Sequence, residues 1–330
     1  GPGSGPPGSS KIRRVRHMLL YVARRLASAL VLALLVTLIT YLLLAPSFDG
    51  IVANRLGSAA TPEAVRALKA EMGLDRPVLT QYLDWLAHAV RGDLGSSYAT
   101  GEDVSHAVQQ HLGVTLSIVV VTLLLTVAVS VTLGVLAAWR GGVVDRLVQG
   151  VSLTGHLVPN LLIAIALVYL LAIRTKLLPA TGFTPLAEDP VAWARSIVIP
   201  VLALLVASVA GLTAQIRGTM IDELRKDYVR TLRTRGIPTR SIVLRHALRN
   251  AAGPALTVLS FEFIAMFGGA LIIEKVFAIP GFGSYAFDAS LQGDVPVVMG
   301  ITLFAVMLVV VVNLAVDLVN GWLNPKARIF

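Results

Sequence analysis

Six long apolar runs constrain the fold of this chain more than any other feature of its sequence. Five of them contain no Asp, Glu, Lys or Arg, and the sixth contains one acidic residue, Glu262. A helix needs roughly 20 apolar residues to cross the ~30 Å hydrocarbon core of a membrane, and none of the runs alternates like a barrel strand. We therefore predict an all-α integral membrane protein with six transmembrane helices. The runs are residues 26–48, 112–138, 147–173, 196–216, 250–273 and 295–316.

The composition supports a membrane protein and limits its chemistry. Hydrophobic residues make up 55% of the chain and charged residues only 14%, whereas soluble proteins carry about 25% charged residues. The chain has no cysteine, so the sequence offers no disulfide, thiol nucleophile or zinc–thiolate site. The first apolar run is longer than the core of a signal peptide, and we expect it to be a retained span.

The charges between the runs predict the orientation of the chain. With the N-terminus in the cytoplasm, the inner segments carry a net charge of +15 and the outer segments a net charge of −4. Segments rich in Lys and Arg stay on the cytoplasmic side, so we expect both termini in the cytoplasm. The net charge of +9 then reflects topology and contact with membrane lipid, and we expect no nucleic-acid partner.

The segment after the first run, residues 49–106, is too long for a simple turn and too polar to cross the membrane. Its capping and stop signals predict short helices over residues 62–72 and 80–90, which makes it an extracytoplasmic helical segment. The predicted organisation is a tag-like, disordered and basic N-terminus at 1–17, a first span at 18–48, the extracytoplasmic segment at 49–106, and a core at 107–330 with five spans and a cytoplasmic loop at 217–249.

That cytoplasmic loop contains the clearest amphipathic pattern outside the spans. Apolar residues recur every four positions among basic ones, which predicts a helix over residues 220–235. Gly236 is at a natural C-terminal stop, and Pro238 prevents continuation of the helix. The narrow apolar stripe consists of Leu224, Tyr228 and Leu232, with Val229 beside it.

A short amphipathic helix at the membrane surface has two uses that the residue pattern does not separate. It can lie among lipid headgroups, or it can insert its apolar ridge into a groove on a cytoplasmic partner. Arg230, Arg233 and Arg235 fit either use, and they also fit a role as positive-inside charge alone.

Three polar residues inside the spans are candidate functional residues, because polar groups there should face protein or water. Glu262 would meet a substrate amine or a cation of a partner subunit; the alternative is a protonated or hydrogen-bonded packing residue. Asn160 follows Pro159, and His156 precedes it by one turn. This pattern predicts a helix irregularity, either a kink that opens a cavity or a substrate contact. We find no catalytic constellation and no metal-ligand cluster in the sequence.

Several motifs along the chain resemble those of one family. Residues 227–236 read DYVRTLRTRG and residues 245–250 read RHALRN, which is similar to the coupling-helix signature of ABC-importer permeases in its peptide-branch form. The general Glu-Ala-Ala pattern of that signature is replaced by Arg230, Thr231 and Leu232, and its glycine is kept at Gly236. Further motifs are MLLYVARRL at 18–26, GLDRP at 73–77, RGDLGSSY at 91–98, PGFG at 280–283 and NPK at 324–326. Together they resemble the B-type permease subunit of the oligopeptide and dipeptide ABC importers.

The resemblance implies a type I ABC importer permease fold and a set of partners. A homologous C-type permease subunit would complete the pore, two ABC ATPase subunits (or one fused ATPase) would bind below it, and an extracytoplasmic solute-binding protein would deliver the substrate. The sequence contains no phosphate-binding loop and no Gly-Lys pair. We therefore expect this chain to bind no cofactor and to be no enzyme by itself, with ATP and Mg on the partner ATPase subunits.

The resemblance also implies roles for particular residues. Tyr228 and Leu232 would form a docking ridge for the ATPase and Gly236 its stop, and the three arginines would flank the contact. Pro280, Gly281, Phe282 and Gly283 would form a tight outer turn on the face presented to the binding protein.

Two alternatives remain open at the level of sequence. An importer of the same branch for nickel, glutathione, haem or short sugars would share these motifs. A secondary transporter or an intramembrane enzyme belongs to a different class, but a secondary transporter of this size is expected to show an internal repeat and buried coupling charges. We find no convincing repeat, and Glu262 alone lies deep in a span.

Overall fold

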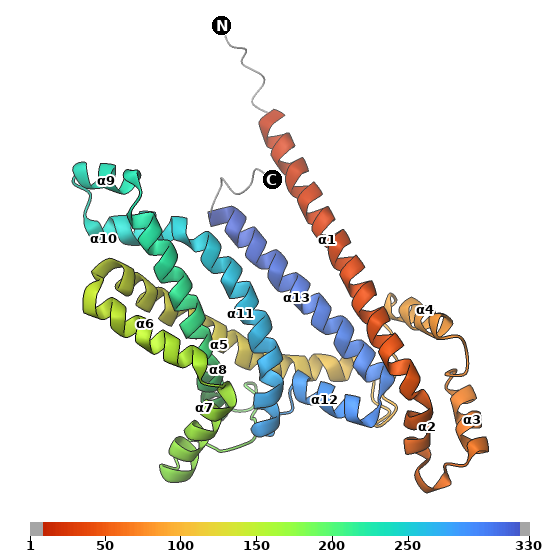
Figure 1. Ribbon diagram of the computed structural model, residues 1–330. Coiled ribbons are helices and arrows are strands. Elements are labelled where there is room, and N and C mark those ends of the chain that lie inside the picture. The colour runs from red at the N-terminus through yellow and green to blue at the C-terminus, as the bar shows by residue number, and fades with distance from the viewer. Residues whose placement is uncertain (1–8, 324–330) are drawn as a thin grey trace. The chain divides into compact units, whose positions relative to one another are not determined.

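The computed structural model describes residues 9–323 (Figure 1). The described chain is built from helices, with one isolated bridge between Ser96 and Asp103. It forms two compact units: the first comprises residues up to 105 together with 292–314, and the second comprises 106–291 together with residues from 315 onward. Residues 1–8 of the predicted tag-like, disordered start and the motif at 324–326 lie outside the described residues. The prediction of disorder is wrong for residues 9–17, because the first helix begins at Ser9.

The spans agree with the apolar runs of the sequence. Five helices are long and apolar enough to cross a membrane, and two further helices joined by a 96° bend count together as a sixth span. Every predicted run lies inside one of these segments, so the all-α fold with six spans is confirmed. The segments are Ala23–Ala53, Val104–Arg140, the bent pair Gly142–Leu157 and Asn160–Arg174, Pro190–Leu224, Thr239–Val276 and Val295–Gly321.

The first unit joins the first span to a series of short helices, and both predicted helices of the outer segment are present. The hydroxyl of Thr61 accepts a hydrogen bond from the backbone N–H of Ala64 at 3.2 Å, which caps the first of them. The elements are α1 (Ser9–Leu44), η1 (Ala45–Ser47), α2 (Phe48–Leu56), η2 (Gly57–Ala59), α3 (Pro62–Glu71), α4 (Val78–Ala89) and most of α13 (Val295–Leu323).

Hydrogen bonds between buried side chains fasten α4 to α1 in this unit. The hydroxyl of Tyr41 donates to Oε1 of Gln81 at 2.9 Å, and the hydroxyls of Thr37 and Tyr82 lie 3.0 Å apart. Tyr41 and Tyr82 are only 5% and 4% exposed and pack edge to face. Because their polar atoms are paired, the outer segment can bury these rings against the first span without an unsatisfied hydroxyl.

The second unit contains four of the spans. Its α8 packs mainly against α11, α6 and α7. The elements are most of α5 (Val104–Arg140), α6 (Gly142–Leu157), α7 (Asn160–Leu167), the π-helix η3 (Val168–Arg174), α8 (Pro190–Leu224), α9 (Asp227–Thr234), α10 (Thr239–Ser241), the π-helix η4 (Ile242–Ala247), α11 (Leu248–Val276), α12 (Phe282–Gln292) and the end of α13.

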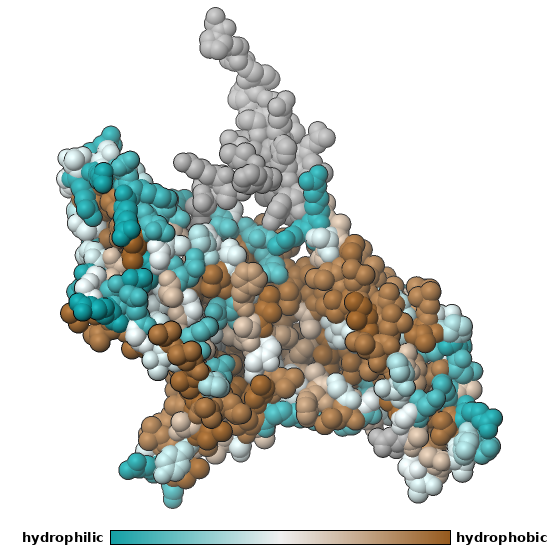
Figure 2. Space-filling view, in the orientation of Figure 1, coloured by the Kyte–Doolittle hydropathy of each residue, from teal (hydrophilic) through white to brown (hydrophobic). Residues whose placement is uncertain are grey.

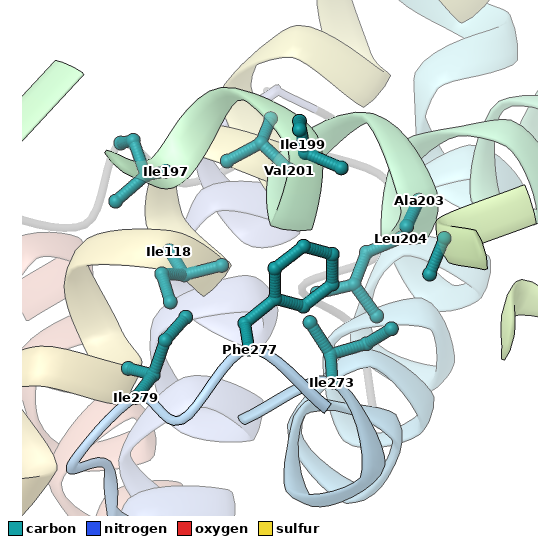
Figure 3. Close-up of a cluster of buried hydrophobic side chains, with 10 residues drawn as sticks. Ile118, Ile197, Ile199, Val201, Ala203, Leu204, Ile273, Phe277 and Ile279 are labelled. Atoms are coloured by element: carbon teal, nitrogen blue, oxygen red, sulfur yellow. The ribbon is translucent and has the colours of Figure 1, made fainter. Parts of the chain in front are cut away.

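Phe277 is at the centre of a buried apolar cluster in this unit (Figure 3). Its ring lies between α8, the end of α11 and Ile118 of α5, and it is 2% exposed. The cluster fixes the point where α11 ends and the chain turns toward α12. Its buried members are Ile118, Ala164, Ile197, Ile199, Val201, Ala203, Leu204, Ile273, Phe277 and Ile279.

The third span is broken where the sequence predicts an irregularity. α6 ends at Leu157, Val158 adopts an extended conformation with ψ 120°, and α7 begins at Asn160 after Pro159. A residue before proline is biased away from the helical region, and proline has no N–H to continue the helix. The predicted kink is therefore confirmed, although it is a complete break rather than a bend within one helix.

The predicted single helix over residues 220–235 is wrong, because the chain forms two helices there. α8 continues to Leu224, Lys226 is extended with ψ 152°, and α9 begins at Asp227. The acidic Asp227 is in the first turn of α9, where a negative charge favours the start of a helix. The apolar pattern spans this break because Leu224 belongs to the last turn of α8.

In Figure 2, hydrophilic side chains cover the corner around α9 and α10, whereas α7 is covered by hydrophobic ones.

Candidate functional site

α9 is a short amphipathic helix with a defined end. The N–H of Gly236 donates to the carbonyl of Arg233 at 3.0 Å, and the N–H of Ile237 donates to the carbonyl of Leu232 at 3.2 Å. These two bonds form a Schellman motif, which needs a residue with positive φ after the helix. Gly236 has φ +74°. The predicted glycine stop is thus present.

The side chains of α9 divide into an inner and an outer face. Val229 is 1% exposed and is the most buried of the predicted stripe, whereas Tyr228 and Leu232 are half-buried. The outer face is polar and basic. Its exposed residues are Asp227, Arg230, Thr231, Arg233, Thr234 and Arg235.

The hydroxyl of Tyr228 connects α9 to two of the long helices. It donates to Oε2 of Glu223 on α8 at 2.9 Å and accepts from Nδ2 of Asn250 on α11 at 3.3 Å. Lys226 also pairs with Glu223. Burial raises the pKa of Tyr228, so its hydroxyl stays protonated and able to donate. The hydroxyl of Tyr228 therefore joins α9 to both α8 and α11.

The structure brings Glu262 and His156 together. The carboxyl group of Glu262 lies beside the hydroxyl of Ser208 of α8 and close enough to His156 of α6 for an electrostatic interaction. Asn160, the first residue of α7, contacts α11 at a point further along that helix. Its Nδ2 atom is 3.9 Å from the position that a Cβ would occupy at Gly269 of α11. The pathway candidates are thus close to one helix, but Asn160 is not part of the Glu262 cluster.

A groove of about 500 Å³ lies between α6 and α8 beside this cluster. At Arg217 the two helices are joined by an ion pair, because both Nε and Nη2 of Arg217 donate to the carboxylate of Asp145. The lining residues are Val148, Gln149, Gly150, Ser152, Leu153, His156, Ala210, Gly211, Thr213, Ala214 and Arg217.

The turn at 280–283 folds around a buried carboxylate that the sequence did not single out as a site. Glu274 is 0% exposed and accepts hydrogen bonds from the hydroxyl of Thr115 and, at 2.8 Å, from the N–H of Ser284. The same Thr115 hydroxyl accepts from the N–H of Phe282 at 2.7 Å. We call this arrangement the Glu274 socket. It caps the N-terminus of α12 with a negative charge, which a helix start favours.

The close packing around the Glu274 socket explains why both Gly281 and Gly283 lack a side chain. A Cβ at Gly281 would overlap the carboxyl group of Glu274, and a Cβ at Gly283 would lie 2.7 Å from the backbone of Leu271. Gly281, Phe282 and Gly283 are buried, and Pro280 is exposed. Within the described residues no group of three or more His, Cys, Asp or Glu side chains has the arrangement of a metal site.

Comparison with known proteins identifies the class to which this arrangement belongs. Residues 130–329 match the family model described as "Binding-protein-dependent transport system inner membrane component", and residues 18–119 match the N-terminal model of the same systems. The chain belongs to this family of membrane permeases, and it is a multi-pass inner-membrane protein.

Individual relatives cover almost the whole chain. It is 35% identical to a probable peptide ABC transporter permease, y4tP, of Sinorhizobium fredii, over 93% of this chain and 99% of the relative. It is 34% identical to a putative peptide transport system permease of Brucella abortus, over 93% and 98% of the two chains. The oligopeptide transport system permease AppB of Bacillus subtilis is 33% identical over 77% of this chain and 82% of its own length.

Proposed function

We propose that this chain is the B-type permease subunit of an ATP-driven importer of peptides and forms half of the translocation pathway. The observation that carries the proposal is α9. It is short, it is stopped by Gly236, and it exposes a basic face while Tyr228 ties it to α8 and α11. Such a helix can receive a displacement from a bound protein and transmit it to the spans. The peptide transport named for the relatives supports the cargo class.

The partners follow from this role. Two ABC ATPase subunits, or one fused ATPase, bind ATP and Mg and contact α9 from the cytoplasm; both termini of the chain are on that side. A C-type permease subunit completes the pore, and an extracytoplasmic solute-binding protein delivers the peptide. The positive charge of the proposed inner segments supports this orientation.

The division of α9 into two faces refines the docking proposal. Leu232 and the basic residues Arg230, Arg233 and Arg235 contact the ATPase, whereas Val229 and Tyr228 hold the helix on its own chain. Since the exposed face is basic, the cleft that receives it is expected to be acidic. The buried turn at 280–283 leaves Pro280 as its exposed residue for contact with the binding protein.

Replacement of Gly236 tests the coupling role. Gly236→Leu forces a side chain into a conformation with φ +74°, which costs roughly 1 kcal/mol and misplaces the end of α9. We expect the variant to insert into the membrane but to lose copurification of the ATPase subunits and coupled uptake.

A matched control is available in the outer segment. Gly101 also has φ +74° and open space around it, so Gly101→Leu carries the same backbone strain in the segment proposed to be extracytoplasmic. It is expected to retain the ATPase subunits. Full uptake by the Gly236→Leu complex would refute the assignment of α9.

The cargo is tested through the solute-binding protein. The molecule that copurifies with the cognate binding protein is expected to be a peptide. Recovery of a nickel chelate, glutathione or haem instead would replace the cargo and leave the permease role intact.

A further inference from the structure

A glycine on α8, Gly211, leaves space for the side chain of Glu262. A Cβ placed at Gly211 would lie 2.6 Å from Oε1 of Glu262, closer than real Cβ contacts allow. Gly211 therefore lets the carboxyl group of α11 lie directly against the backbone of α8. An acidic side chain within an apolar span is expensive, and a neighbour shaped to receive it indicates that its position matters.

The contacts of Glu262 leave much of its hydrogen-bonding capacity unused. An ionised carboxylate accepts about four hydrogen bonds, and Ser208 supplies one donor. His156 contributes an electrostatic interaction. No Lys or Arg is among the described contacts of Glu262. Arg217, the basic residue of the neighbouring groove, is paired with Asp145. Glu262 is therefore an acidic side chain that no Lys or Arg among its described contacts balances.

The groove gives a ligand access to this acidic side chain. Gly211 and His156 both line the cavity of about 500 Å³ between α6 and α8, so Glu262 lies at its edge and is itself half-buried. The groove is also beside the end of α6, which stops at Leu157 because of the break at Pro159. The C-terminal end of a helix carries a partial negative charge, which adds to the attraction for a cation.

We propose that Glu262 binds the amino-terminal ammonium group of a peptide in transit, with the rest of the peptide in the groove between α6 and α8. This inference rests on the proposed function, since it specifies what the pathway recognises. An ammonium group supplies three donors for the free acceptor positions of the carboxylate, and a charge-assisted hydrogen bond in a site of low dielectric is strong.

The test uses the complete complex in proteoliposomes, with trialanine and N-acetyl-trialanine as cargoes. The acetylated peptide has the same length but no ammonium group. Binding of each peptide to the solute-binding protein is measured separately, and each is supplied at saturation. We expect Glu262→Gln to lower trialanine uptake at least about tenfold, as the loss of a hydrogen bond between charged groups predicts, and to leave uptake of the acetylated peptide unchanged.

A substitution on α8, with its control, tests the position of the Glu262 carboxyl group without changing residue 262. Gly211→Ala keeps the glutamate but displaces its carboxyl group, and we expect the same selective loss of trialanine uptake. Gly218→Ala is the matched control, because a Cβ there meets nothing within 4 Å, and we expect no change for either peptide.

Three results would overturn the inference, and one of them also removes its basis. An equal loss of uptake for both peptides would make Glu262 a packing residue. Loss of the second permease subunit from purified Glu262→Gln complexes would make it a contact between subunits. If the wild-type complex takes up neither peptide, the proposed function fails, and the inference fails with it.

Discussion

Two glutamates on the same helix, α11, are held in opposite ways. Glu274 is fully enclosed, and its carboxylate accepts hydrogen bonds from Thr115 and from the start of α12. Glu262 is half-buried beside a groove, with a serine hydroxyl and a histidine as its neighbours. A buried carboxyl group with a hydrogen bond on each oxygen contributes to structure, whereas one with fewer partners and access to a groove is available to a ligand. The comparison supports a structural role for Glu274 and the proposed recognition role for Glu262.

The largest effect on stability is expected from Glu274→Ala. The substitution leaves the N–H of Ser284 and the hydroxyl of Thr115 without their acceptor in a site closed to water, which costs about 3 kcal/mol. Thermal unfolding of the purified complex in detergent measures the loss. Glu63→Ala on α3 is the control, since Glu63 pairs with Arg66 on the surface and such pairs contribute little. An unchanged unfolding temperature for Glu274→Ala would break the comparison.

A smaller loss of about 1–2 kcal/mol is expected from Thr115→Val, which keeps the shape of the side chain and removes the hydroxyl. This hydroxyl links Glu274 to the N–H of Phe282. In the double variant with Glu274→Ala the two losses should not add, because both substitutions disrupt one network. Strict additivity would show that the Glu274 socket is not a single unit.

Tyr228→Phe extends the comparison to a third polar site, at the corner between α8, α9 and α11. Loss of the hydroxyl removes the bonds to Glu223 and Asn250 and is expected to lower stability by about 1 kcal/mol. We also expect the amount of peptide transported per ATP hydrolysed to fall severalfold while the ATPase subunits remain bound. An unchanged transport ratio would reduce the tyrosine to a packing role.

The smallest effect on stability is expected from Glu262→Ala, within about 1 kcal/mol of the wild type, because a half-buried carboxyl group with few partners contributes little to folding. The same unfolding assay measures it alongside Glu274→Ala. If Glu262→Ala destabilises the complex as much as Glu274→Ala, the distinction between the two glutamates is lost.

The sequence predicts the spans well because a membrane imposes its own length requirement. Each apolar run lies within a long helix, and the signals at Thr61 and Gly236 give a helix start and a helix stop at those residues. These are local properties, and each depends on a few neighbouring residues.

The breaks and the polar sites are harder to predict because they depend on distant parts of the chain. Pro159 breaks a span, whereas Pro200 and Pro254 lie inside continuous helices, and the three prolines look alike in sequence. The partner of Glu274 is Thr115, 159 positions away. The sequence therefore identified Glu262 as an isolated charge but gave no sign that Gly211 and His156 would surround it.

The uninterrupted length of α8 has a mechanical consequence. Its 35 residues make a rod about 52 Å long, whereas the hydrocarbon core is only ~30 Å thick. About 20 Å of the helix therefore projects past the lipid tails, and α9 is attached to its last turn through Glu223. A rod of this length that pivots by only about 10° moves one end by roughly 9 Å relative to the other, so a small rotation of α8 corresponds to a large displacement at the end that carries α9.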